Sequence, residues 1–152
     1  MFEKLAKALS AAELRASMAE TIAQRVQAES IARDRAERAH REYVDRFLHD
    51  RLTRRDIAEL RTRMVAAAAR GAFEALVLRF PSSLCRDDGR AIGNGEQGWP
   101  ETLPGKARHA YRLWHRIGRS RGYRLRATIL DYPGGIPGDV GLFLDWSPPP
   151  LA

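Results

Sequence analysis

The sequence has little of several features that would identify its class. Its single cysteine, Cys85, excludes a disulfide within the chain and fits a reducing compartment, so we expect a cytoplasmic protein. No apolar run approaches the roughly eighteen residues that a transmembrane helix needs. The first nine residues also lack the apolar segment and cleavage site of a signal peptide. The sequence therefore predicts no association with a membrane.

Patterns typical of catalytic and cofactor sites are also missing. The glycine-rich residues 89–98 have neither the Gly-Lys-Ser/Thr ending of a P-loop nor Gly-x-Gly-x-x-Gly spacing at a helix start. The two histidines of the N-terminal half lie too far apart for an i, i+4 zinc pair. We therefore expect no catalytic residue, no metal and no cofactor. The alternative is a small enzyme with its site in the loop 82–100, where Cys85 would pair with His109 or His115.

Glycine and proline are both absent from residues 10–70, a stretch rich in Ala, Arg and Glu. These residue types favour helix, so residues 1–70 are expected to form a helical arm and residues 71–152 a separate small head domain. The arm carries 15 basic and 11 acidic residues, interspersed as on a solvated helix surface.

Two helix starts are recognisable within the arm. Ser10 and Glu13 fit a capping box, in which each side chain binds the backbone N–H of the other residue, and Thr53 and Asp56 repeat the pattern. Gly71 is suited to the C-terminal cap of the second helix. The expected helices cover about residues 11–50 and 54–70. One unbroken helix with Thr53 exposed within it is the alternative.

The first helix has an apolar face that the rest of the chain is too small to cover. A helix of forty residues spans about 60 Å, whereas a head of about eighty residues is about 25 Å across. We therefore expect a homo-oligomer or a protein partner on this face, although Arg25 and Glu29 interrupt the strict heptads of a regular coiled coil. The candidate interface residues are Leu14, Met18, Ile22, Ala32, Ala36, Ala39, Tyr43 and Phe47.

The head is predicted to follow a β-α-β-β order. The expected strands are residues 73–80, 123–132 and 140–146, with a helix over 103–117 and a glycine-rich loop over 82–100. A helix between the first two strands allows a right-handed crossover and a parallel pair, and the last two strands should form an antiparallel hairpin. The predicted fold is α+β with a three-stranded mixed sheet. The second face of this sheet has to be covered by residues 66–69 or by another protomer.

Acidic residues are absent from residues 102–130, which carry eight basic residues. A helix places Arg108, Arg112 and Arg116 in one stripe, and guanidinium groups suit phosphate. Arg119 and Arg121 follow in the next turn, and these five residues are the candidate polyanion site. The alternative is a solvated surface whose arginines form salt bridges.

Trp99 is the remaining candidate, for a protein-binding hot spot, because it precedes Pro100 in the loop. Together these patterns favour a non-enzymatic, self-associating assembly or adaptor protein that presents a small α/β head. The alternative is a nucleic-acid-binding protein that uses the arginine-rich helix.

Overall fold

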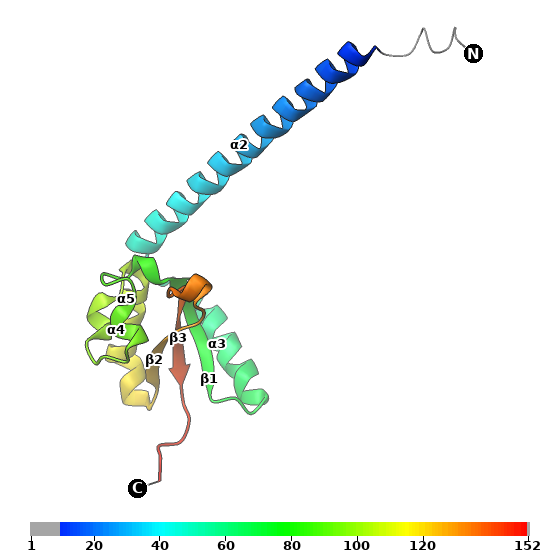
Figure 1. The fold of residues 1–152 in the computed structure, drawn as a ribbon. Coiled ribbons are helices and arrows are strands. Elements are labelled where there is room, and N and C mark those ends of the chain that lie inside the picture. Colours follow the sequence, from blue (N-terminus) through cyan, green and yellow to red (C-terminus); the bar gives the residue numbers. More distant parts are fainter. Residues whose placement is uncertain (1–9, 152) are drawn as a thin grey trace. The chain divides into compact units, whose positions relative to one another are not determined.

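A computed structural model of the chain describes residues 10–151, which combine a long helix with a three-stranded sheet and shorter helices (Figure 1). The α+β class is confirmed. The chain divides into two compact units, Met1–Tyr43 and Val44–Ala152. This division differs from the boundary expected at residue 70, because the second helix belongs to the second unit. The part of the expected arm over residues 1–9 lies outside the described residues.

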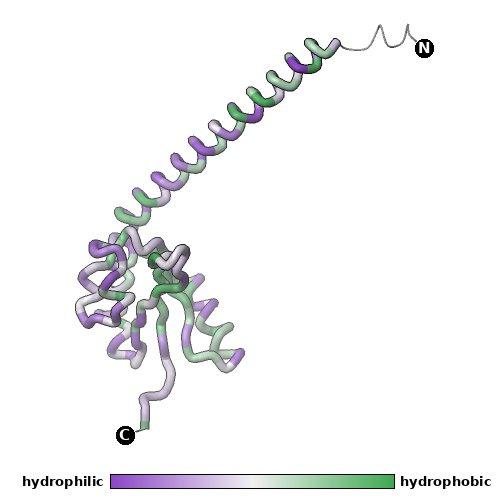
Figure 2. The backbone as a smooth tube through the Cα atoms, viewed as in Figure 1, coloured by the Kyte–Doolittle hydropathy of each residue, from purple (hydrophilic) through white to green (hydrophobic). Residues whose placement is uncertain are grey.

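Helix α2 (Ala11–His49) begins at the predicted capping box. The Ser10 N–H donates to Glu13 Oε2 at 2.6 Å, and the Glu13 N–H donates to Ser10 Oγ at 3.1 Å. Every side chain of residues 10–43 is exposed, and hydrophobic and hydrophilic residues are mixed along this part of the helix (Figure 2). The large apolar side chains of residues 10–43 therefore stay exposed to solvent.

Helix α3 (Arg54–Ala69) begins at the second predicted capping box. The Thr53 N–H donates to Asp56 Oδ2 at 2.9 Å, and the Asp56 N–H donates to Thr53 Oγ1 at 3.1 Å. The break between two helices is thus confirmed, and one unbroken helix is wrong. After α3, Gly71 takes the left-handed conformation (φ 80°), as predicted for its cap.

The sheet is antiparallel throughout, with strand order β1-β3-β2. Its strands are β1 (Glu74–Pro81), β2 (Arg124–Ile129) and β3 (Asp139–Asp145). The hairpin of β2 and β3 is confirmed, but the mixed sheet is wrong because β3 lies between β1 and β2. The central strand carries the fully buried Val140 and Leu142, whereas β2 carries exposed arginines that suit an edge.

Two of the helices beside the sheet lie on the same face of it. Leu60 of α3 and Leu113 of α5 (Gly105–Leu113) line the same groove as Leu125 and Leu144 of the sheet. By alternation, the arginines of β2 point to the opposite face. That face carries polar and charged pairs, so the expectation that residues 66–69 or another protomer must cover it is not needed. The pairs are Arg124–Asp145, Arg126–Glu74 and Arg126 over Phe143.

The segment between β1 and α5 forms short helical turns instead of one long loop. Asp87 accepts hydrogen bonds from the N–H groups of Gly89 and Ala91, at 3.1 and 2.8 Å, and so starts one of these turns. The turns are η1 (Ser82–Leu84), α4 (Arg90–Gly93) and η2 (Trp99–Thr102). After α5 come η3 (Trp114–Gly118, a π-helix), η4 (Arg119–Arg121) and η5 (Pro133–Gly135).

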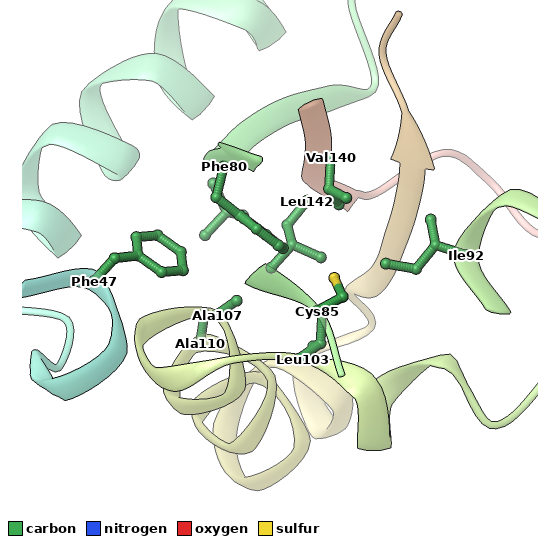
Figure 3. Packing of buried hydrophobic residues seen from close by; sticks show 10 residues of the cluster. Phe47, Phe80, Cys85, Ile92, Leu103, Ala107, Ala110, Val140 and Leu142 are labelled. Carbon is green, nitrogen blue, oxygen red and sulfur yellow. The ribbon is translucent and has the colours of Figure 1, made fainter. Parts of the chain in front are cut away.

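The hydrophobic core belongs to the second unit and lies between the sheet and α5 (Figure 3). Phe80, Leu142 and Val140 are its largest fully buried side chains. Phe47 is only 6% exposed, and its ring lies 5.1 Å from that of Phe80. Phe47 is therefore a core residue, which corrects its place among the candidate interface residues. The other core residues are Val77, Cys85, Ile92, Leu103, Ala107 and Ala110.

Candidate anion-binding cleft

The cleft depends on a close approach between the chain at the end of α2 and the first residue of α5. Gly105 begins α5 with φ 23°, and a Cβ atom there would collide with the carbonyl oxygens of Phe47 and Leu48. Only glycine has no Cβ, so it lets the two backbones meet. This contact brings residues 48–51 beside α5.

A second contact connects the same segments. The Leu52 N–H donates to His109 Nδ1 at 2.8 Å, across 57 residues of sequence. Because Nδ1 accepts this bond, the proton of the neutral imidazole is assigned to Nε2, which becomes a donor. His109 therefore positions the segment before α3 and keeps one donor for a ligand.

The space between these segments is a cleft of about 390 Å³ with a strongly basic lining. Arg108, Arg112 and Arg116 all line it, so the predicted stripe forms one wall even though the helix changes to π geometry after Leu113. Arg51 is a fourth arginine, contributed by the chain before α3. The remaining lining residues are Leu48, His49, Asp50, Gly105, His109 and Leu113.

The positive charge of the cleft is largely uncompensated. Within residues 10–151, none of the four lining arginines forms an ion pair with a carboxylate. Arg108 makes only a long contact of 3.5 Å to the Glu101 carbonyl oxygen. Among the described residues that line the cleft, Asp50 is the one acidic side chain. Such a site attracts anions, and bidentate phosphate or carboxylate groups match the guanidinium geometry.

The surroundings of His109 in the cleft change the pKa of its imidazole. Partial burial lowers its pKa, and the positive charges of Arg51, Arg116 and Arg112 lower it further. The imidazole is thus kept neutral, which agrees with its acceptor role toward Leu52. A bound anion would offset the arginines and raise the pKa of His109 again.

Two of the five candidate arginines lie elsewhere. Arg119 Nη1 is 3.1 Å from His115 Nε2, and Arg121 lines a different, apolar groove.

Sequence reasoning missed Arg51, since it lies far from α5 in the chain and carries no local pattern. It considered His109 only as a partner of Cys85, although its i, i+3 and i+7 spacing to Arg112 and Arg116 places it on their side of the helical segment.

Trp99 is not an exposed side chain. It is half-buried, with its ring 6.0 Å from that of Tyr111 in an edge-to-face arrangement. Its carbonyl oxygen also accepts a hydrogen bond from Thr102 Oγ1 at 2.7 Å. Trp99 therefore packs beside α5 while part of its surface stays exposed, and its role as a partner-binding residue stays a prediction.

Cys85 is in the core and is unsuited to act as a nucleophile. Burial, together with the nearby Asp87 carboxylate, raises the pKa of the thiol to about 12. A thiol with such a pKa carries almost no thiolate at neutral pH. The alternative of a thiolate–imidazolium pair therefore has no support from this geometry.

The candidate interface residues of the first unit are all exposed. Leu14, Met18 and Ile22 are 49%, 63% and 57% exposed, and Tyr43 is also exposed. Ala32, Ala36 and Ala39 share this exposure. Val26 and Ile31, which the prediction left out, are exposed as well.

Comparison with known proteins adds no assignment: no family model, no curated protein and no solved structure matches this chain. Among the helices of residues 10–151, none is long and apolar enough to cross a membrane. Within the same residues, no three His, Cys, Asp or Glu side chains are grouped so that they could hold a metal ion.

Proposed function

We propose that this is a non-enzymatic assembly or adaptor protein that self-associates through α2 and presents its second unit to a partner. The proposal is carried by one observation: every side chain of residues 10–43 is exposed, including the large aliphatic ones. Aliphatic side chains that recur on one helix face are typical of protein interfaces. The cytosol is the proposed compartment, because the lone Cys85 has no disulfide partner in the chain.

The test is the oligomeric state of the full chain over a range of concentrations. Ile22→Glu places a charge on the apolar face and should shift sedimentation or light scattering toward monomer. Gln27→Glu is the matched control, because it introduces the same acid on the opposite side of the same helix. A wild-type chain that stays monomeric at high concentration contradicts the proposal.

The cleft favours a second function, binding of a polyanion such as nucleic acid. Arg108, Arg112 and Arg116 form one wall of a concave site in which Arg51 and the Nε2–H of His109 add further donors. When such arginines bind phosphate groups, the counterions condensed on the nucleic acid are released. The binding constant therefore falls steeply as the salt concentration rises. The uncompensated charge supports this role over that of a salt-bridged surface.

A triple charge reversal tests this function. Replacing Arg108, Arg112 and Arg116 by Glu should abolish binding to single-stranded or duplex nucleic acid. For the wild type, a plot of the logarithm of the binding constant against that of the salt concentration should have a slope to which these residues contribute roughly three phosphate contacts. The matched control reverses three exposed arginines outside the cleft, Arg70, Arg86 and Arg90. Equal loss in both triple variants would indicate an unspecific effect of net charge and contradict a role for the cleft.

A further inference from the structure

The basic cleft has a smaller hollow next to it, which we call the side pocket. Its volume is about 250 Å³. Arg108 and Arg112 line both the cleft and the side pocket, so the two spaces share these guanidinium groups. A ligand held by the shared arginines therefore has access to both spaces. The other residues that line the side pocket are Gln97, Gly98, Pro100, Glu101 and Tyr111.

Tyr111 places an aromatic ring beside the shared arginines. It follows Arg108 by three residues in α5, and residues with this spacing lie on one face of a helix. Its ring centroid lies 6.0 Å from that of Trp99 and 5.6 Å from that of Trp114, and the side chain is half-buried. Packing thus holds the ring, while part of its surface lines the side pocket. A ring that is already held loses little side-chain entropy when a ligand stacks on it.

The polar groups of the side pocket differ from those of the cleft. Gln97 and Glu101 line it, and both are exposed. The Gln97 amide can donate and accept hydrogen bonds, and the Glu101 carboxylate accepts them. The edges of nucleobases offer matching donors and acceptors. A carboxylate repels phosphate but not an uncharged base, so the side pocket suits a base and the arginines suit its phosphates.

The sizes of the two spaces indicate a ligand that is longer than one nucleotide. The side pocket is smaller than the pockets of drug-sized ligands, which measure about 300–1,000 Å³, so it suits one planar base. Arg51 and Arg116 line the cleft but not the side pocket. These two arginines are in excess for a single phosphate, and they match the neighbouring phosphates of a continuous strand.

Use of both spaces requires an unpaired base. In a duplex, each base is stacked on its neighbours and its edge is paired, so its face cannot lie on Tyr111. The bases of a single strand can be splayed out, stacked on aromatic side chains and hydrogen-bonded at their edges. Proteins that bind single strands combine a positively charged groove with such aromatic rings. A duplex would contact the arginines alone.

We propose that the ligand of the basic cleft is a single-stranded nucleic acid, with its phosphates on the cleft arginines and one unpaired base on Tyr111 in the side pocket. This inference rests on the polyanion binding proposed above and names the class of polyanion. Tyr111 and Gln97 are thereby assigned as base-binding residues, which act beside the phosphate-binding arginines.

Abasic oligonucleotides test the inference on the unmodified full chain. An abasic strand keeps every phosphate of a normal strand of the same length but has no base to stack. The normal strand should bind about 5- to 150-fold more tightly, which is the effect of one stacked base. A duplex of the same length has the higher charge density, so arginines alone would bind it at least as tightly as the strand. We expect the opposite order at equal salt concentration.

Substitution of Tyr111 locates the base. Tyr111→Leu removes the ring and leaves the cleft arginines in place, so it should keep the affinity for the abasic strand and lose the advantage of the normal strand. Tyr111→Phe is the matched control, because it retains a ring and should retain this advantage. Gly98→Leu serves as the second variant if Tyr111→Leu fails to fold. It adds a side chain at the side pocket, where no atom lies within 4 Å of a Cβ, and should also remove the advantage.

The outcomes separate this inference from the proposed polyanion binding. Equal affinity for normal and abasic strands, or a duplex bound as tightly as the strand, overturns the inference and leaves polyanion binding intact. A free mononucleotide that binds as tightly as the strand also overturns it, as does an unchanged advantage in folded Tyr111→Leu and Gly98→Leu. Absence of binding to every polymer at low salt overturns both. Loss of the advantage in Tyr111→Leu, with its retention in Tyr111→Phe, supports the inference.

Discussion

His109 Nδ1 accepts a hydrogen bond from the backbone N–H of Leu52 at 2.8 Å, and this bond joins the cleft to the break between the two helices. Arg51 precedes Leu52 directly, and the capping residue Thr53 follows it. The same short segment therefore starts α3, supplies one arginine of the cleft and is held by a residue of α5. Changes in the protonation of His109 should consequently affect both stability and anion binding.

Acidification is expected to destabilise the second unit through His109. Its pKa is lowered from 6.5 in the folded state, so the unfolded chain binds more protons as the pH falls through this range. The contribution of neutral His109 to the free energy of unfolding is fully present above pH 6.5. It is lost as the pH falls through the lower pKa that His109 has in the folded state. Urea unfolding at several pH values should show this loss. His109→Gln, which does not titrate, should show a smaller dependence, and equal slopes would contradict the assignment.

Local sequence patterns predicted the parts of the fold that local forces decide. Both capping boxes and the glycine cap depend on residues that lie within a few positions of one another in the sequence, so the sequence alone could predict them. The strand order could not, because any pair of strands satisfies alternation, and the burial of Val140 and Leu142 decides which strand is central. The stripe of arginines was also local, whereas Arg51 reaches it only through the tertiary contact at Gly105.

Gly105→Ala should strongly destabilise the second unit. An added Cβ would collide with two backbone carbonyl groups at the end of α2, which cannot move aside as a flexible side chain would. We expect a loss of more than about 2 kcal/mol, in the range of overpacking and backbone strain. Gly98→Ala is the control, because no atom lies within 4 Å of a Cβ at that position. Thermal unfolding should separate the two variants, and similar midpoints would be inconsistent with the close approach.

Phe47→Ala should unfold or weaken the second unit, although Phe47 is part of α2. Its ring is buried beside Phe80, and truncation of a buried phenylalanine costs about 3–5 kcal/mol. Ile22→Ala, at an exposed position of the same helix, should leave the stability of the second unit within about 0.5 kcal/mol of the wild type. Denaturant titration followed by tryptophan fluorescence measures the difference, since all three tryptophans belong to the second unit. A mild effect of Phe47→Ala would return this residue to the set of candidate interface residues.

Thr53→Ala should cost about 0.5–2 kcal/mol, the usual range for loss of a helix N-cap. The Asp56 N–H loses its acceptor, and the reciprocal bond from Thr53 to the Asp56 carboxylate weakens. Thr62→Ala is the matched control: its hydroxyl donates to the Ala58 carbonyl oxygen inside α3, where alanine is a better helix former. It should be neutral or slightly stabilising in thermal unfolding. Equal effects of the two substitutions would argue against a stabilising cap.

Cys85 should resist alkylation in the folded protein. The side chain is 4% exposed, and its pKa is raised to about 12 by burial and by the Asp87 carboxylate, so both access and thiolate are lacking. Mass spectrometry after treatment with iodoacetamide at neutral pH should show little modification, and full modification should follow unfolding in denaturant. Reaction of the native protein that is as fast as that of the unfolded chain would show a reactive thiol and revive the small-enzyme alternative. Gly105→Ala offers a further check, because loosening the second unit should expose the thiol and raise its rate of alkylation toward that of the unfolded chain.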